Sequence, residues 1–231
     1  APYSDVAYIN GSLPAKAMKV SGAMPNPPKQ LAIELAEELK KQNIDFKGKI
    51  MINSEKIING EKPILFPDNK VILEYKSPTL DKIVYWFLKK SVNLFGETFV
   101  KTMAKEKTGN PSFESGMKYL KSFWKDKGID ERMINFVDGS GLSPQNYASA
   151  KAEVLALLWA KKQPWFSAYY DGFPVMGNGM KMKSGSIKDS RAFTGYHTSA
   201  TGKNYVFSII MNNYQANDLS NALYNVLNVL K

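Results

Sequence analysis

The last third of the chain holds the pattern that most limits the fold, because three strand-like stretches follow one another with only short connections. These stretches are residues 180–183, 192–199 and 204–212. The connection Ala200-Thr201-Gly202-Lys203 is typical of a hairpin loop, and residues 185–190 join the first stretch to the second. We therefore expect a three-stranded antiparallel meander.

Amphipathic helices are predicted before and after this meander, since apolar residues recur there at helical spacing. The predicted helices cover residues 29–42, 79–104 with a break at 89–93, 112–127, 145–162 and 216–230. Shorter patterns predict strands at residues 49–53, 57–58, 71–75 and 135–138, a turn at 67–69 and a loop-rich entry over residues 1–28. Together these elements favour an α+β fold, an antiparallel sheet with flanking helices.

The chemistry open to this sequence is narrowed by its lack of cysteine and its single histidine, His197. Disulfides, thiol catalysis, cysteine-based metal sites and multi-histidine metal sites are thereby excluded. The formal net charge of +10 suits an anionic partner, although the dispersed lysines equally suit a solvated basic surface. No apolar run reaches the roughly 18 residues that a membrane-spanning helix needs, so no transmembrane segment is expected.

Three short motifs stand in a fixed order along the chain. Ser91-Val92-Asn93 ends the first long helix, Asp138-Gly-Ser-Gly-Leu-Ser143 forms a turn-rich loop, and Lys183-Ser184-Gly185-Ser186 lies on the first strand of the meander. With these motifs the chain resembles the penicillin-binding, serine-type D-alanyl-D-alanine carboxypeptidases. More narrowly, it is similar to the low-molecular-mass class C carboxypeptidase/endopeptidases, whose Ser-x-Asn, DGSGLS and Lys-Thr-Gly or Lys-Ser-Gly motifs follow in this order.

The resemblance implies both a fold and an activity. Residues 71–231 would be the C-terminal segment of a penicillin-binding, serine β-lactamase-like transpeptidase domain, and residues 1–70 the end of an inserted accessory domain. The implied activity is hydrolysis of terminal D-Ala-D-Ala bonds, and of D-amino-acid cross-links, in peptidoglycan through an acyl-serine intermediate. The family needs no metal or organic cofactor, is inhibited by β-lactams and works in the periplasm or elsewhere outside the cytoplasm.

The resemblance also assigns catalytic roles to three residues. Ser91 would pass a proton to the amine of the leaving D-alanine, and Asn93 would hydrogen-bond a backbone carbonyl of the substrate. Lys183 would hold Ser91 and place positive charge against the terminal carboxylate of the peptide. The structural alternative is that these residues only interrupt a helix and end a strand.

Three neighbouring residues would bind substrate if the resemblance holds. The hydroxyl of Ser184 would bind the terminal carboxylate, and the backbone N–H of Ser186 would be one donor to the oxyanion. Gly185 would let the substrate backbone lie against the strand, because a side chain there would intrude. We expect the loop at residues 138–143 to be a scaffold that caps the following helix, and His197 to be an ordinary strand residue.

The nucleophile motif of the family is missing where it is expected, since no Ser-x-x-Lys precedes Ser91. Two later matches, at residues 115–118 and 122–125, fall on the polar side of the 112–127 helix, and Lys-Thr-Gly at residues 107–109 falls at a helix end. We therefore expect a C-terminal fragment, inactive alone, that supplies the Ser-x-Asn and Lys-Ser-Gly motifs. Its missing N-terminal half, or a second copy, would be its partner.

Two other functions remain open at this point. The first is a non-catalytic module that recognises peptidoglycan stem peptides or another anionic wall polymer, which the missing Ser-x-x-Lys favours. The second is a nucleic-acid binder, which only the net charge favours, because the sequence has no recognisable reader module. The chain also differs from the family's usual sequence at Asp189-Ser190, where a Gly-Val pair is common.

Overall fold

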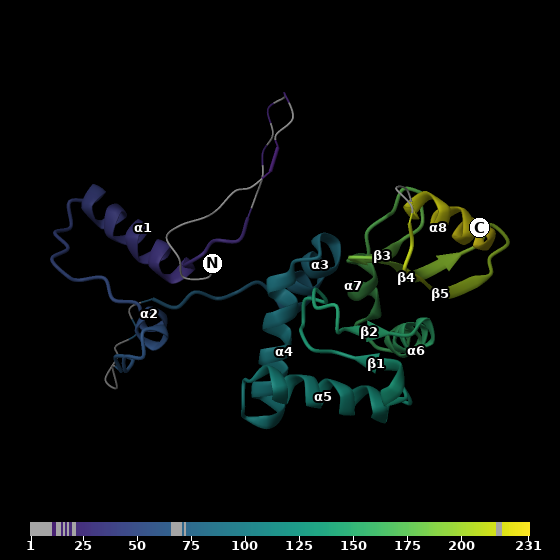
Figure 1. Cartoon of the computed structure of the whole chain (residues 1–231), viewed down its shortest axis with the longest axis horizontal. Helices are drawn as coiled ribbons and strands as arrows, with labels where there is room; N and C mark the ends of the chain where they lie inside the picture. Colours follow the sequence, from purple (N-terminus) through teal and green to yellow (C-terminus); the bar gives the residue numbers. More distant parts are fainter. Residues whose placement is uncertain are drawn as a thin grey trace. The chain divides into compact units, whose positions relative to one another are not determined.

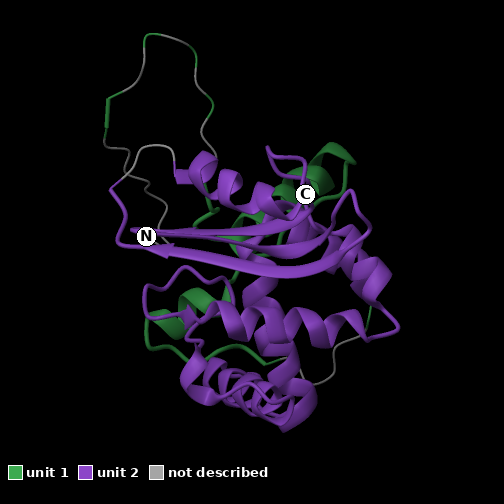
Figure 2. Cartoon of the chain, turned by 90° about the vertical axis from the view of Figure 1, so that its right-hand side faces the viewer, with its two compact units in different colours: residues 1–74 green, residues 75–231 purple. Residues whose placement is uncertain are grey.

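The computed structural model describes residues 22–65, 73–215 and 219–231, together with positions 11, 12, 15, 17, 19 and 71. The turn expected at residues 67–69, the start of the helix expected at 216–230 and much of the entry over 1–28 therefore lie outside the described residues. The chain divides into two compact units, residues 1–74 and residues 75–231 (Figure 2).

The first unit contains two helices, α1 (Pro27–Lys41) and α2 (Asn53–Ile58). Asn26 caps α1 by accepting a hydrogen bond from the Lys29 backbone N–H at 3.3 Å. The strands expected at residues 49–53 and 57–58 are wrong, and the strand expected at 71–75 is absent at its described positions. A strand needs a neighbour to pair its backbone, and the described residues of this unit supply none.

The second unit holds the remaining helices. They are α3 (Leu80–Lys90), α4 (Asn93–Thr108), α5 (Phe113–Asp126), α6 (Ala150–Lys161), α7 (Phe166–Asp171) and α8 (Leu219–Leu227), with short 3₁₀ turns at Glu131–Met133 and Asn228–Leu230. The break expected at residues 89–93 separates α3 from α4. Helix α6 begins later than expected because Ser149 caps it, accepting from the Ala152 N–H at 3.1 Å. Helix α7 was not expected.

The sheet of this unit is the predicted meander (Figure 1). Its strands are β3 (Met182–Ile187), β4 (Ser190–Thr198) and β5 (Asn204–Asn212), antiparallel in the order β3-β4-β5. A separate short ladder pairs β1 (Ile134–Asn135) with β2 (Tyr147–Ala148). Strand β3 runs farther than predicted, so that only Lys188 and Asp189 make the turn to β4, and Asp189 takes a positive φ of 58°.

Apolar side chains cover both faces of the sheet, and helices lie on either side of it (Figure 2). Met182 and Phe193 pack with Leu223 of α8 on one face. On the other face, Tyr196 packs with Leu157 of α6 and donates its hydroxyl hydrogen bond to the Leu157 carbonyl at 2.8 Å. The expected α+β class is confirmed, and β3 is left as an edge strand. Among the described residues, no helix is long and apolar enough to cross a bilayer.

Candidate active site

Ser91 lies in the turn that joins α3 to α4, where it adopts a left-handed backbone conformation with φ of 51°. A non-glycine residue in this region is uncommon, and such residues often mark functional turns. The Lys183 Nζ on strand β3 donates a hydrogen bond to the Ser91 Oγ. Two motifs that lie 92 residues apart in the sequence therefore meet at the edge of the sheet.

Lys183 is held in a half-buried position beside this edge. Its Nζ also donates to the carbonyl oxygen of Ser184 at 3.0 Å. Burial, with the nearby Arg191 guanidinium as a second cause, lowers the pKa of Lys183 from its ordinary value. The Lys183 Nζ thus places a hydrogen-bond donor against the Ser91 hydroxyl oxygen at the edge of the sheet.

The other predicted site residues line the same region. Asn93 is the first residue of α4 and is exposed, and its side chain forms no hydrogen bond within the described part of the chain. Ser184 is half-buried, while Gly185 and Ser186 are exposed on β3. A Cβ added at Gly185 would meet only the Cβ of Ala192, at 3.9 Å, so internal packing does not require glycine there.

The loop at residues 138–143 braces the start of α4. Glu97 accepts hydrogen bonds from the backbone N–H groups of Gly139 at 3.2 Å and Ser140 at 3.0 Å. Gly96 and Gly139 approach so closely that a Cβ on Gly96 would lie 2.2 Å from the Gly139 carbonyl oxygen. The loop is a scaffold, but the expectation that it caps the following helix is wrong, since Ser149 does so.

The structural role of Glu97 was not predicted from the sequence. The carboxylate lies one turn after Asn93 on α4. Its two backbone partners sit 42 and 43 residues away, so the pairing is visible only in the folded chain. The sequence therefore gave no indication of these loop contacts.

A cavity of about 890 Å³ adjoins Gly185 and Ser186. Helices α4 and α5, the loop at residues 138–143 and the sheet form its walls, with apolar side chains such as Phe99, Met103 and Leu120. Glu153 of α6 also lines it and accepts a hydrogen bond from the Ser208 Oγ at 2.7 Å. Burial raises the pKa of Glu153 above its ordinary value.

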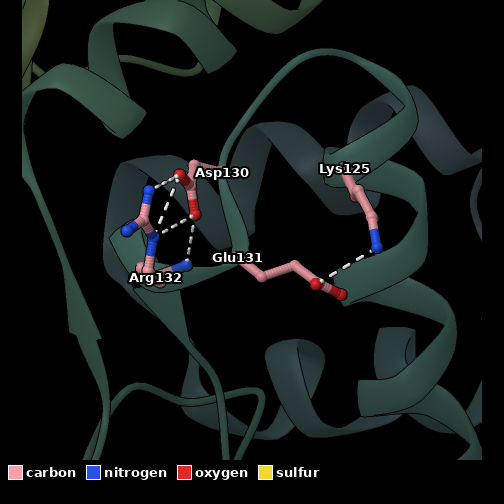
Figure 3. A network of polar contacts seen from close by, with 4 residues as sticks. All are labelled: Lys125, Asp130, Glu131 and Arg132. Atoms are coloured by element: carbon pink, nitrogen blue, oxygen red, sulfur yellow. Dashed lines mark hydrogen bonds and ion pairs between the residues drawn. The ribbon is translucent and has the colours of Figure 1, made fainter.

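The side chains of the later Ser-x-x-Lys matches on α5 are exposed, ion-paired or part of the first turn of the helix. Lys118 and Ser122 are exposed, and the Lys125 Nζ pairs with Glu131 at 3.2 Å (Figure 3). Ser115 belongs to the first turn of α5, where its N–H bonds the capping Ser112 Oγ at 3.2 Å. Lys107-Thr108-Gly109 closes α4 and is not part of a strand.

His197 lies on β4 opposite Tyr205, in a strand as expected. Across the described ranges, no group of three or more His, Cys, Asp or Glu side chains is arranged to hold a metal ion.

Comparison with known proteins identifies the relatives of the chain. A family model described as the D-Ala-D-Ala carboxypeptidase 3 (S13) family matches residues 5–230. A D-alanyl-D-alanine carboxypeptidase from Actinomadura sp. (strain R39) is 27% identical over 228 residues, which cover 89% of this chain and 41% of the relative. The D-alanyl-D-alanine carboxypeptidase DacB of Haemophilus influenzae is 24% identical, over 88% of this chain and 44% of the relative.

A solved structure shows the same fold. The crystal structure of penicillin binding protein 4 (dacB) from Haemophilus influenzae, complexed with a β-lactam, superposes with a TM-score of 0.70 at 24% identity. The match covers 89% of this chain and 51% of that protein. The chain thus spans about half of that structure, and less than half of the two carboxypeptidases.

Proposed function

This chain belongs to the D-Ala-D-Ala carboxypeptidase 3 (S13) family, and from that premise we propose that it carries part of a site that hydrolyses the terminal D-Ala-D-Ala bond of peptidoglycan stem peptides. The observation that supports this proposal most strongly is the hydrogen bond from Lys183 to Ser91. It joins two motifs that have no reason to touch if each is only a helix end or a strand end. Because peptidoglycan lies outside the cytoplasmic membrane, the proposal includes an extracytoplasmic location.

The proposed reaction is acyl transfer to a serine followed by hydrolysis. As the peptide C–N bond breaks, the nitrogen of the leaving D-alanine takes a proton from the Ser91 hydroxyl. Ser91 then takes up the proton that the attacking serine released, so that no net proton is gained or lost. The Lys183 ammonium orients the Ser91 oxygen and favours the developing negative charge through a charge-assisted hydrogen bond. Water then attacks the acyl-serine ester and releases the shortened peptide.

Substrate binding is proposed along the open edge of β3. Edge strands present unpaired N–H and C=O groups, so an extended peptide can add as a further strand. Gly185 leaves that edge unobstructed, and the Ser186 N–H would point to the oxyanion. Asn93, with its side chain free of hydrogen bonds among the described residues, is available to bind a carbonyl of the peptide backbone.

The attacking serine and its lysine base are proposed to come from polypeptide outside residues 1–231. Two observations support this. No Ser-x-x-Lys precedes Ser91, and the later matches belong to the exposed face and ends of α5. The cavity beside Gly185 has apolar walls that a packed helix would remove from water. The cavity is lined by Gly185 and Ser186, which follow Lys183 on β3.

Covalent labelling with a fluorescent penicillin tests the proposal. We expect the full-length protein to become covalently labelled, with label that survives denaturation. We expect the 231-residue chain alone to take up no label. Ser91→Ala and Lys183→Met in the complete protein should each lower kcat/KM for a D-Ala-D-Ala peptide by about a hundredfold or more. The matched change Ser122→Ala on α5 should leave it unchanged.

Two outcomes would contradict the proposal. Stable labelling of the 231-residue chain would place the nucleophile within it. Failure of the complete protein to label, together with binding of stem peptides without turnover, would identify a non-catalytic recognition module instead.

A further inference from the structure

Aromatic rings form a continuous cluster in the second unit, where α5 and α6 end and α7 begins. The Trp159 ring of α6 lies edge-to-face against Phe123 and Trp124 of α5, with ring centroids 5.4 and 5.7 Å apart. Trp165 stands directly before α7, 5.8 Å from the Trp159 ring, and is 46% exposed. The cluster is therefore not closed off from water but ends in an exposed ring, which is typical of a surface that binds a partner.

Helix α6 adds an aliphatic side chain and two lysines to this exposed end. Leu158 is 41% exposed. Lys161 and Lys162 follow it by three and four residues, a spacing that places all three on one face of the helix, and both lysines are exposed. Leu158 and Trp165 thus leave apolar area in water next to positive charge, and covering that area would be favourable.

A third lysine belongs to the same surface. The Lys127 Nζ, at the end of α5, lies 5.3 Å from the centroid of the Phe123 ring and 5.9 Å from that of Trp159. Within the described part of the chain, Lys127, Lys161 and Lys162 form no ion pair. Asp126 precedes Lys127 and offsets part of its charge.

The other carboxylates near the end of α5 are already paired. Glu131 accepts from Lys125 at 3.2 Å, and Asp130 accepts from Arg132 at 2.6 Å (Figure 3). They are therefore not free to neutralise the three lysines, and an anion from outside the chain would do so.

Helix ends account for part of this arrangement. A lysine at the end of a helix is favourable by itself, because the carbonyl end of the helix carries partial negative charge. Lys127 and Lys161 both meet that condition. The effect gives no reason for Leu158 and Trp165 to stay exposed beside them, so the apolar and the charged parts together need a further explanation.

We propose that the surface formed by Lys127, Leu158, Lys161, Lys162 and Trp165, the basic aromatic patch, binds the face of an anionic phospholipid bilayer. Tryptophan favours the interface between headgroups and acyl chains, and lysines are attracted to anionic headgroups. An anionic sugar polymer would match the lysines, but it gains little from covering an aliphatic side chain such as Leu158, whereas the interface does. With two apolar side chains and no attached lipid, the association is reversible.

Co-sedimentation of the full-length protein with vesicles tests the charged part of the patch. We expect binding to vesicles of equal parts phosphatidylglycerol and phosphatidylcholine, weaker binding to phosphatidylcholine alone, and a loss of the difference as salt is raised. The double change Lys161→Gln and Lys162→Gln should weaken binding to the anionic vesicles by about thirtyfold, which is about fivefold for each lysine. The matched double change Lys105→Gln and Lys107→Gln, at the end of α4, removes the same charge and should have little effect.

Two further variants test the apolar part. Trp165→Ala should weaken binding to anionic vesicles by about tenfold, and Leu158→Gln by about fivefold. Glutamine is a good helix former and Leu158 is exposed, so Leu158→Gln keeps the fold, which circular dichroism checks. The control is Trp86→Ala on α3, which removes a tryptophan that is 51% exposed and should leave binding unchanged.

Three outcomes would overturn the inference. The first is a full-length protein that does not bind anionic vesicles, and the second is an equal loss of binding in the patch variants and their controls. The third is binding to isolated glycan strands but not to vesicles, abolished by the patch variants, which would assign the patch to the sugar polymer. Because these measurements need no turnover, their failure is distinguishable from a failure of the proposed function.

Discussion

The two units of the chain differ in how they bury apolar side chains. Helix α1 in the first unit buries no residue, and it leaves Leu31 and Leu35 69% and 58% exposed. In the second unit Met182 and Phe193 are 0% exposed beneath α8. Both units have amphipathic helices in the sequence. Among the described residues, only the second unit has a sheet that the apolar face of a helix can cover. Amphipathicity therefore predicts a helix but does not supply the surface it packs against.

The largest expected effect comes from removing a core ring in the second unit. Phe193→Ala deletes a side chain that the sheet and α8 enclose completely, and we expect it to lower the free energy of unfolding by about 3–5 kcal/mol. Leu35→Ala on α1 should change it by less than about 0.5 kcal/mol. Urea unfolding followed by circular dichroism checks both. A similar loss for the two variants would show that the first unit buries Leu35 after all.

A smaller effect on the unfolding free energy is expected where the loop at residues 138–143 contacts α4. A Cβ on Gly96 would collide with the Gly139 backbone, which cannot move aside as a flexible side chain can. We expect Gly96→Ala to cost about 1–3 kcal/mol of unfolding free energy. The matched change Gly22→Ala in the first unit adds a methyl group to open space and should be neutral. Equal stability of the two variants would mean that the loop is not clamped against α4.

The smallest expected effect is a pH dependence in the wall of the cavity. Because burial raises the pKa of Glu153, the folded state binds its proton more tightly than the unfolded state does. This stabilisation is full below the ordinary pKa and is lost as pH rises through the raised one. Glu153→Gln should therefore flatten the fall in unfolding free energy above about pH 4.5. Parallel profiles for the wild type and Glu153→Gln would indicate that water reaches Glu153 freely in the cavity.

Sequence patterns predicted the second unit well because its elements are determined by local periodicity and its strands by short connections. The break between α3 and α4 and the β3–β4–β5 meander are examples. The strands expected in the first unit failed for a physical reason, since a strand is defined by a neighbour and not by its own residues. The α7 helix, six residues long, was missed because so short a segment carries little periodic signal.

Some residues of the candidate site could be predicted from the sequence and others could not. Ser91, Asn93 and the Lys183 strand could be named from their motifs, although their roles stay predictions. The role of Glu97 could not, because its partners are backbone N–H groups of a distant loop that no sequence spacing reveals. The Lys183–Ser91 hydrogen bond combines both, because its two residues were named from sequence motifs and their contact is visible only in the fold.

Kinetic coupling between those two side chains is the most direct test of the account. A double-mutant cycle of Ser91→Ala and Lys183→Met is measured on kcat/KM of the complete protein with a D-Ala-D-Ala peptide. If the two residues act as one unit, the double variant is no slower than the slower single variant. Fully additive losses would contradict the account, because they would mean that Ser91 and Lys183 contribute independently.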